Sequence, residues 1–409
     1  MEMDSSSGIA PVEIRRLPQV EFTALLAMLF ATVAFSIDSM LPALPAIGGE
    51  LSPTDVNRAQ LILSAFVLGM GIGTFVVGPI SDAIGRKPAI TGGVFLYVIG
   101  ALMAYFSTSL EFLLAARVVQ GIGAAAPRIV GLALSRDLYA GREMARVMSF
   151  VMMVFMIVPA LAPMMGAGII AIFGWRGIFL AFVLFGLLSL SWLLVRQEET
   201  LPPERRRALS ARNLWAALKE VVSNGEVMLY TAAMTLGFGQ MFALLSSIQQ
   251  IFDQTYQRGA SFPYWFALIA LVSASASFIN SRYVVRLGMR RLATLAYLGQ
   301  VILSLVMIVL FASGLVTGTL AFACFFVWAN SIFFIAGLTF GNLNALAMQK
   351  MGHIAGMATS VISAISTVMA VVIAAPVGLA FDGTALPAMI GAAICSAICF
   401  ALMKRSERF

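Results

Sequence analysis

Three ionisable side chains lie inside long apolar runs of this sequence: Asp38, Arg117 and Arg128. Asp38 stands in the stretch FSIDSMLPALPAI, residues 35–47. An ionisable group near the centre of a bilayer costs about 2.5–3.5 kcal/mol on insertion scales, so a carboxylate at such a place is by default a functional candidate. The chemistry open to it is reversible protonation close to a fixed positive charge.

Asp38 and Arg117 are predicted to lie at similar depth. At a rise of about 1.5 Å per residue, both fall in the same half of a membrane when their helices run in opposite directions. Burial favours the neutral acid, whereas a nearby guanidinium favours the carboxylate. When the two effects nearly cancel, a small rearrangement can change the protonation of Asp38. The alternative is a structural ion pair that only fixes two helices.

Two prolines follow the acid, Pro42 and Pro45. Proline removes an intrahelical hydrogen bond and bends or ends a helix. The pair therefore either frees backbone carbonyls near Asp38 or simply marks a helix terminus.

Arg128 follows Pro127 and comes eleven residues after Arg117, so both arginines share one helix face. If that face lines a cavity, the path holds two positive charges and one negative charge, which leaves room for neutral or anionic substrates. Alternatively, Arg128 extends to the membrane interface.

The composition is that of a polytopic membrane protein. The chain is 60% hydrophobic and 11% charged, with a mean hydropathy of +0.95. Its net charge of +7 is not read as a nucleic-acid footprint, because the basic residues follow a topological pattern. The cysteines, Cys324, Cys395 and Cys399, lie in apolar runs and His353 is the single histidine, so neither a metal site nor a cofactor is expected. Enzyme chemistry lacks support, because the spans hold no paired carboxylates and the chain no nucleophile elbow.

A membrane span needs about 20 mostly apolar residues. The sequence is predicted to contain twelve: 22–47, 57–80, 89–107, 110–134, 144–172, 176–196, 226–251, 263–285, 292–313, 318–347, 354–380 and 385–403.

Lys and Arg residues set the predicted orientation. With both termini cytoplasmic, only Arg58, Arg176 and Arg258 fall in loops on the outer side, and Arg117 and Arg128 fall within a span. The other basic residues of the 26 lie on the cytoplasmic side. This bias predicts an all-α membrane protein with an even number of spans.

The longest polar stretch divides the chain into two halves of six spans. We expect a cytoplasmic tail over residues 1–19, a six-helix bundle over 20–196, a cytoplasmic linker over 197–222 and a second bundle with a short tail over 223–409. The loop GPISDAIGRKP (78–88) and the loop YVVRLGMRRL (283–292) both carry a glycine followed by paired basic residues, a weak trace of internal repetition.

Several motifs resemble the major facilitator superfamily. GPISDAIGRKP is similar to its signature Gly-x-x-x-Asp-x-x-Gly-Arg-Lys, and LLAARVVQGIGAA (113–125) to its fourth-helix motif. ALAPMMGAG (160–168) resembles the fifth-helix motif of antiporters, with Ala162 and Ala167 where Gly is usual. DSMLPALP (38–45), SRDLY (135–139) and ETLPPERR (199–206) resemble the Bcr/CflA drug-resistance subfamily. The resemblance covers essentially the whole chain and implies a major facilitator fold of 12 helices.

The resemblance also implies a cytoplasmic gate. Its residues are Gly78, Asp82, Gly85, Arg86, Lys87 and Asp137. Asp82 is expected to face the start of the eleventh span near His353, and Arg86 to pair with Asp137, holding the inward side closed. The alternative is a solvated loop that only sets topology.

The functional expectation is export of small amphipathic or drug-like molecules in exchange for protons, with Asp38 as proton carrier balanced by Arg117. The alternative is a facilitator or proton-coupled carrier of one metabolite on the same fold. Candidate substrate-cavity residues are Gln120, Arg128, Gln240 and Asn330. By resemblance the protein is expected as a monomer in a bacterial inner membrane, with lipid, protons and a small-molecule substrate as its partners and no nucleic acid.

Overall fold

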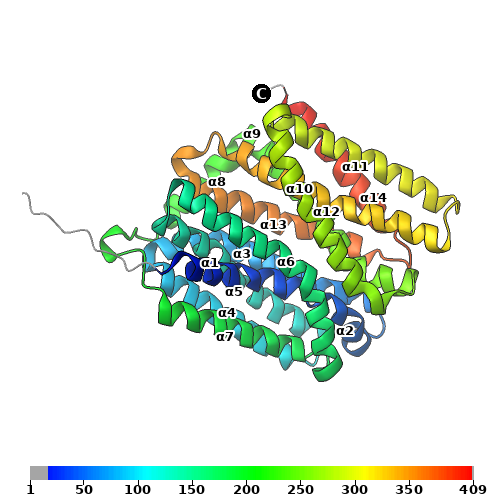
Figure 1. The fold of residues 1–409 in the computed structure, drawn as a ribbon, viewed down its shortest axis with the longest axis horizontal. Helices are drawn as coiled ribbons and strands as arrows, with labels where there is room; N and C mark the ends of the chain where they lie inside the picture. Colours follow the sequence, from blue (N-terminus) through cyan, green and yellow to red (C-terminus); the bar gives the residue numbers. More distant parts are fainter. Residues whose placement is uncertain (1–16, 408–409) are drawn as a thin grey trace, which may run out of the picture.

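Long helices run side by side in two bundles that a linker joins (Figure 1). The structure, a computed structural model, describes residues 17–407. The first half contains α1 (Gln19–Asp38), α2 (Leu44–Leu51), α3 (Leu61–Ile84), α4 (Arg86–Tyr105), α5 (Leu110–Leu138), α6 (Gly141–Phe173) and α7 (Gly177–Arg196).

The linker carries one helix, and the second half repeats the six-span pattern. These elements are α8 (Ala211–Ser223), then α9 (Gly225–Gln250), α10 (Phe262–Leu287), α11 (Met289–Ala312), α12 (Gly318–Met348), α13 (Ala355–Leu379) and α14 (Leu386–Ser406). Twelve helical segments in the described part of the chain are long and apolar enough to cross a membrane, with α1 and α2 forming one of them. The predicted number of spans is confirmed.

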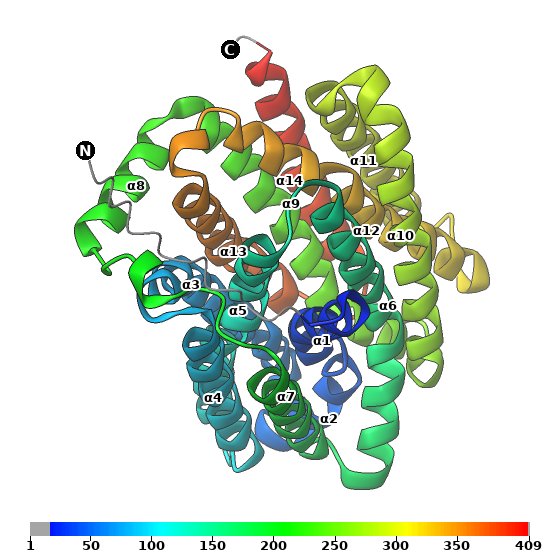
Figure 2. The same ribbon diagram turned by 60° about the vertical axis from the view of Figure 1, so that its left-hand side comes forward.

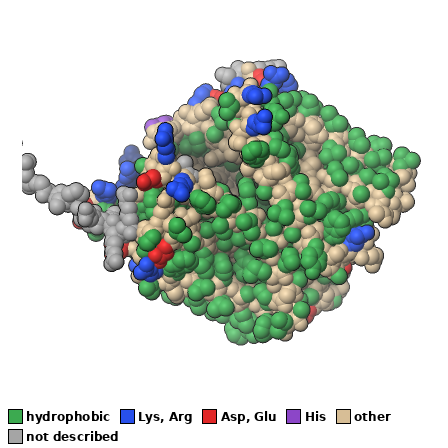
Figure 3. Space-filling model, in the orientation of Figure 1, with side chains coloured by type: hydrophobic (Ala, Val, Ile, Leu, Met, Phe, Trp, Pro, Cys, Tyr) green, Lys and Arg blue, Asp and Glu red, His purple; other side chains and the backbone are tan. Residues whose placement is uncertain are grey.

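The outer surface of the bundle is apolar. Large hydrophobic side chains such as Leu184, Phe278 and Val309 are more than half exposed. Figure 3 shows hydrophobic side chains over most of one face, with Lys and Arg gathered mainly toward the end that carries the linker. So much exposed apolar surface fits a protein whose solvent is lipid.

Glycines bring α3 and α4 unusually close to α5. A side chain at Gly69 would overlap the backbone of Val118, and one at Gly121 would overlap the backbone of Phe66. On the other face of α5, a side chain at Gly123 would overlap Tyr97 of α4. Small residues allow this kind of contact between membrane helices. These contacts fix α5 rigidly within the first half.

The two halves share one turn geometry. Gly85 joins α3 to α4 with φ 108° and ψ 161°, and Gly288 joins α10 to α11 with φ 79° and ψ 154°. A positive φ of this kind is accessible to glycine without steric cost. The glycines of the two similar loops in the sequence therefore occupy equivalent places in the two bundles.

The halves meet along two helix pairs, α3 with α13 and α6 with α10. Figure 2 shows α3, α5, α1 and α6 facing α13, α9, α12 and α10. We call the end of the bundle that carries residues 197–210 the linker side and the other end the opposite side. Figure 3 shows a hollow between the halves toward the linker side.

Amide side chains close the opposite side. Asn57 Nδ2 donates to the backbone oxygen of Phe381 at 2.8 Å, and Gln250 Nε2 donates to Asn57 Oδ1 at 3.3 Å. Gln60 also donates to Gln250. These side-chain hydrogen bonds join the first bundle directly to the second. The two bundles are therefore held together at the opposite side.

Candidate functional site

Asp38 is the last residue of α1, where the first span breaks. Pro42 lies in a short 3₁₀ turn, Leu41–Ala43, and Pro45 lies in the first turn of α2. Because proline lacks a backbone N–H, it suits the start of a helix and not its interior. A helix therefore ends at Asp38, as one interpretation of the prolines expected, and Phe35 O still accepts a hydrogen bond from Ser39 N.

The Asp38 side chain is deeply buried. Asp38 keeps 6% of its surface exposed, and the described part of the chain offers its carboxyl group no hydrogen bond or ion pair. A buried carboxylate without partners is costly. This acid therefore sits where gain of a proton, or the arrival of a cation, would relieve the cost.

Arg117 reaches the same break from α5. Its Nη2 donates to the backbone oxygen of Ser36 at 2.9 Å, and its Nη1 donates to Gln120 Oε1 at 2.6 Å. The guanidinium carbon lies 4.3 Å from the centre of the Phe66 ring, and the residue is 0% exposed. The structure thus brings Arg117 to the backbone two residues before Asp38, but it forms no ion pair between the two side chains.

Two polar neighbours of this site, Ser36 and Tyr97, were not predicted from the sequence. The hydroxyl groups of Ser36 and Tyr97 lie 2.7 Å apart, and Tyr97 is fully buried on α4. A tyrosine in the middle of an apolar span was the available signal, since a buried phenol needs a polar partner.

Close packing holds the broken span in place. A side chain at Gly166 of α6 would overlap the backbone oxygen of Ser39, the residue after Asp38. This glycine lies in the predicted fifth-helix motif, and α6 packs along α1. The motif therefore lets α6 touch the break directly.

The other predicted cavity residues differ in their surroundings. Gln120 is buried against Arg117, and Arg128 is exposed in the middle of α5. Gln240 is 3% exposed and accepts a hydrogen bond of 2.7 Å from Ser396 of α14. Asn330 donates to Phe326 O of its own helix at 2.8 Å. Gln240 and Asn330 both lie in the second bundle, and these hydrogen bonds stay within that bundle.

The predicted gate residues form a compact network at the linker side. Arg86 donates to Asp82, to Ser81 Oγ at 2.8 Å and to Asp137 at 3.0 Å. Asp137 is the penultimate residue of α5, so this network joins the α3–α4 turn to α5. The pair between Arg86 and Asp137 that the resemblance implied is present.

The linker binds to the same network. Glu199 accepts hydrogen bonds of 2.9 Å from the backbone N–H groups of Arg86 and Lys87, at the start of α4. Thr200 Oγ1 donates to Asp137 at 2.9 Å, and Arg207 N donates to Asp82 O at 2.9 Å. Helix N-termini favour negative charge. We call Glu199–Arg207 the linker strap, because it ties the connection between the bundles to the α3–α4 turn.

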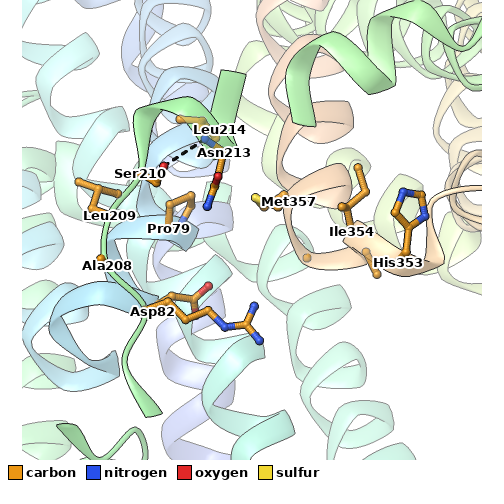
Figure 4. A pocket seen from close by; sticks show the side chains of 13 residues that line it. Pro79, Asp82, Ala208, Leu209, Ser210, Asn213, Leu214, His353, Ile354 and Met357 are labelled. Atoms are coloured by element: carbon orange, nitrogen blue, oxygen red, sulfur yellow. Dashed lines mark hydrogen bonds between the residues drawn. The ribbon is translucent and has the colours of Figure 1, made fainter. Parts of the chain in front are cut away.

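Asp82 and the start of α13 face each other across a cavity. The cavity has a volume of about 220 Å³ and is lined by Pro79 and Asp82, by the linker from Arg207, and by His353 to Met357 (Figure 4). His353 Nε2 lies 2.6 Å from Glu220 Oε1 of α8, not against Asp82. The contact that the sequence analysis expected between Asp82 and this helix start is not formed in this conformation, although a Cβ at Gly78 would lie 3.2 Å from Ser360 of α13.

Comparisons with known proteins agree with this architecture. The family described as the Major Facilitator Superfamily matches residues 24–375. Among solved structures, the xylose transporter XylE from E. coli, in a partially occluded inward open conformation, is similar with a TM-score of 0.71. That likeness covers 96% of this chain and 97% of XylE at 12% identity, so it concerns the fold alone.

Curated relatives carry the comparison further. The chain is 30% identical over 370 residues to the Uncharacterized MFS-type transporter YdgK of Bacillus subtilis, covering 89% of each protein. It is 30% identical to the Bicyclomycin resistance protein homolog of Haemophilus influenzae, covering 92% of this chain and 94% of that protein. Over 59% of this chain and 60% of the relative, it is 30% identical to the Multidrug resistance protein MdtL of Shewanella oneidensis.

The chain belongs to the major facilitator superfamily, a family of multi-pass membrane transporters and not of enzymes. The relatives named for drug resistance are consistent with the resemblance to Bcr/CflA-type transporters.

Proposed function

We propose that this protein exports small amphipathic or drug-like molecules in exchange for protons, with Asp38 as the proton carrier. The observation that carries the proposal is a buried carboxyl group without a described partner at the break of the first span, with the Arg117 guanidinium on the adjacent backbone. Such a group can exchange a proton when one side of the protein opens.

Alternating access supplies the cycle. In our proposal the linker side is cytoplasmic, as the Lys and Arg distribution predicts, and the structure is the state that is closed to the outside. Cargo enters from the linker side, the halves rock about the α3–α13 and α6–α10 pairs, and the amide contacts of Asn57 and Gln250 separate. A proton then binds Asp38 from outside and is released inside.

The membrane supplies the driving force. Each elementary charge that moves down the membrane potential releases about 2.3 kcal/mol per 100 mV. A difference of one pH unit adds about 1.4 kcal/mol per proton. We place the protein in a bacterial inner membrane, because its relatives are bacterial and the chain has twelve apolar segments.

A transport assay in cells without their own drug pumps tests the proposal. Export of a panel of compounds that includes bicyclomycin is measured with and without an uncoupler. Wild type should export some of them only while the proton gradient lasts, and Asp38→Asn should abolish this export at unchanged protein level. Asp55→Asn is the matched control, because Asp55 is exposed in the loop before α3. Export that survives both the uncoupler and Asp38→Asn would favour the alternative, a facilitator of one metabolite.

A further inference from the structure

Asp38, Arg117 and Arg128 are the charged side chains placed well inside the described spans. The other acidic residues of residues 17–407 lie in loops, in the linker or within about one turn of a helix end, as Glu21, Asp137 and Glu226 do. The second bundle therefore offers no carboxylate to the middle of the membrane.

Arg117 and Arg128 share one face of α5 but have different surroundings. Arg117 is fully buried and its donors meet Ser36 O and Gln120 Oε1. Arg128 is exposed, although Pro127 before it and Val130 after it are buried. The described residues give it neither a hydrogen bond nor an ion pair. Its charge is thus unmatched by the protein.

The neighbours of α5 set the direction of the Arg128 side chain. Gly121, two turns earlier on nearly the same face, packs against α3, and Gly131, almost one turn later, packs against Leu26 and Phe30 of α1. The face that carries Gly123 is turned away, against α4. Arg128 therefore points between α1 and α3, toward the second bundle and not toward lipid.

Arg128 also lies at a different depth from the proton site. It comes eleven residues after Arg117, which corresponds to about 16 Å along the helix. It lies ten residues before the end of α5 at Leu138, about 15 Å from the linker side. Asp38 is therefore too distant to form a direct ion pair with it, whether or not it carries a proton.

We propose that Arg128 is a cargo-binding residue that receives the carboxylate of an amphipathic organic acid entering from the linker side. The inference rests on the proposed function, since it names the cargo class for the same passage. A guanidinium binds a carboxylate through two parallel hydrogen bonds, which a neutral ester cannot match. The rest of the molecule occupies the hollow between the halves, and Asp38 stays free to carry the proton.

Binding to the purified full-length protein tests this inference without any proton gradient. The probes are dansylglycine, an amphipathic carboxylate, and its uncharged methyl ester, and energy transfer from tryptophan reports the dissociation constant of each. Hydrogen bonds between charged groups predict that wild type binds the acid about tenfold or more tightly than the ester. Equal binding of the two by wild type overturns the proposal.

Variants then locate the preference. Arg128→Gln should bring the ratio of the two constants to about one by weakening the acid alone. Arg128→Lys keeps the charge but loses the planar fork, so it should weaken the acid by several-fold and leave the ester unchanged. Arg136→Gln, on the same helix at its exposed end, should keep the wild-type ratio. If either Arg128 variant binds the acid with the same dissociation constant as wild type, the proposal is contradicted. If Arg128→Gln does not fold, Arg128→Lys alone provides the test.

The two proposals fail separately. Loss of proton coupling in Asp38→Asn leaves the carboxylate preference of the purified protein in place. Conversely, Arg128→Gln should leave Asp38-dependent export of an uncharged drug intact.

Discussion

Arg117 donates a hydrogen bond of 2.9 Å to the backbone oxygen of Ser36, two residues before Asp38. The guanidinium thus holds the broken end of α1 and places a positive charge beside the acid without neutralising it directly. A rearrangement of the break as the halves rock would change the separation between the acid and this charge, and with it the affinity of Asp38 for a proton.

Replacing Arg117 should lower both stability and transport. Arg117→Gln leaves buried acceptors on Ser36 and Gln120 without donors, and each unsatisfied group costs about 1–3 kcal/mol. We expect a lower melting temperature in detergent and loss of proton-dependent export. Arg58→Gln is the control, since its pair with Glu111 is exposed and such pairs contribute about 0–1 kcal/mol. Equal melting temperatures for the two variants would show that the Arg117 contacts contribute little to the stability of the protein.

Two glycines of α6 provide a matched pair. Gly166→Val places a side chain against the backbone of Ser39 and should displace the break at Asp38, so that export falls strongly. A Cβ at Gly168 would have no neighbouring atom within 4 Å, so Gly168→Val should remain active. Export is measured at equal protein level for both variants. Normal export by Gly166→Val would show that close contact with α6 does not set the position of Asp38.

The linker strap should matter for turnover. Glu199→Ala removes the acceptor at the start of α4, a loss that costs about 0.5–2 kcal/mol at helix N-termini. Because the strap holds the α3–α4 turn through the backbone of Arg86 and Lys87, we expect slower transport with little change in cargo affinity. Glu204→Ala should behave as wild type, because this side chain of the strap is exposed and makes no hydrogen bond to Arg86 or Lys87. Identical transport rates for the two variants would contradict a role of the linker strap in turnover.

Charge reversal at Asp82 tests the gate itself. Asp82→Lys removes one of the two carboxylate partners of Arg86 and places a positive charge opposite the start of α13 across the cavity. Helix starts repel positive charge, so closure of the linker side should become slower. The maximal rate of transport should fall while the cargo concentration at half-maximal rate stays near that of wild type. The reverse pattern would mean that Asp82 binds cargo.

Local sequence patterns predicted much of this fold. Each span is one continuous apolar segment, so length and hydropathy locate it, and the loop GPISDAIGRKP contains Asp82 and Arg86 four residues apart. The partners of Arg117 could not be predicted in this way, because a backbone oxygen such as Ser36 O has no sequence signature. Glu199 is more than a hundred residues from the amides that it caps.

Helix rotation limited the prediction of cavity residues. Sequence places Gln240 well inside its span, but the contact with Ser396 depends on how α9 turns relative to α14. Hydropathy does not determine that angle, because α9 is apolar on most sides. Arg128 was found by its residue type, and only the neighbours of α5 show which way it points.

The most direct test of the central claim measures protons and cargo together. Protein is reconstituted into vesicles that contain a pH-sensitive dye, and a compound from the export panel is driven through it down its own gradient. Wild type should move protons in the opposite direction in step with the compound, and Asp38→Asn should move none. Proton movement by Asp38→Asn equal to that of wild type would contradict the assignment of Asp38 as the proton carrier.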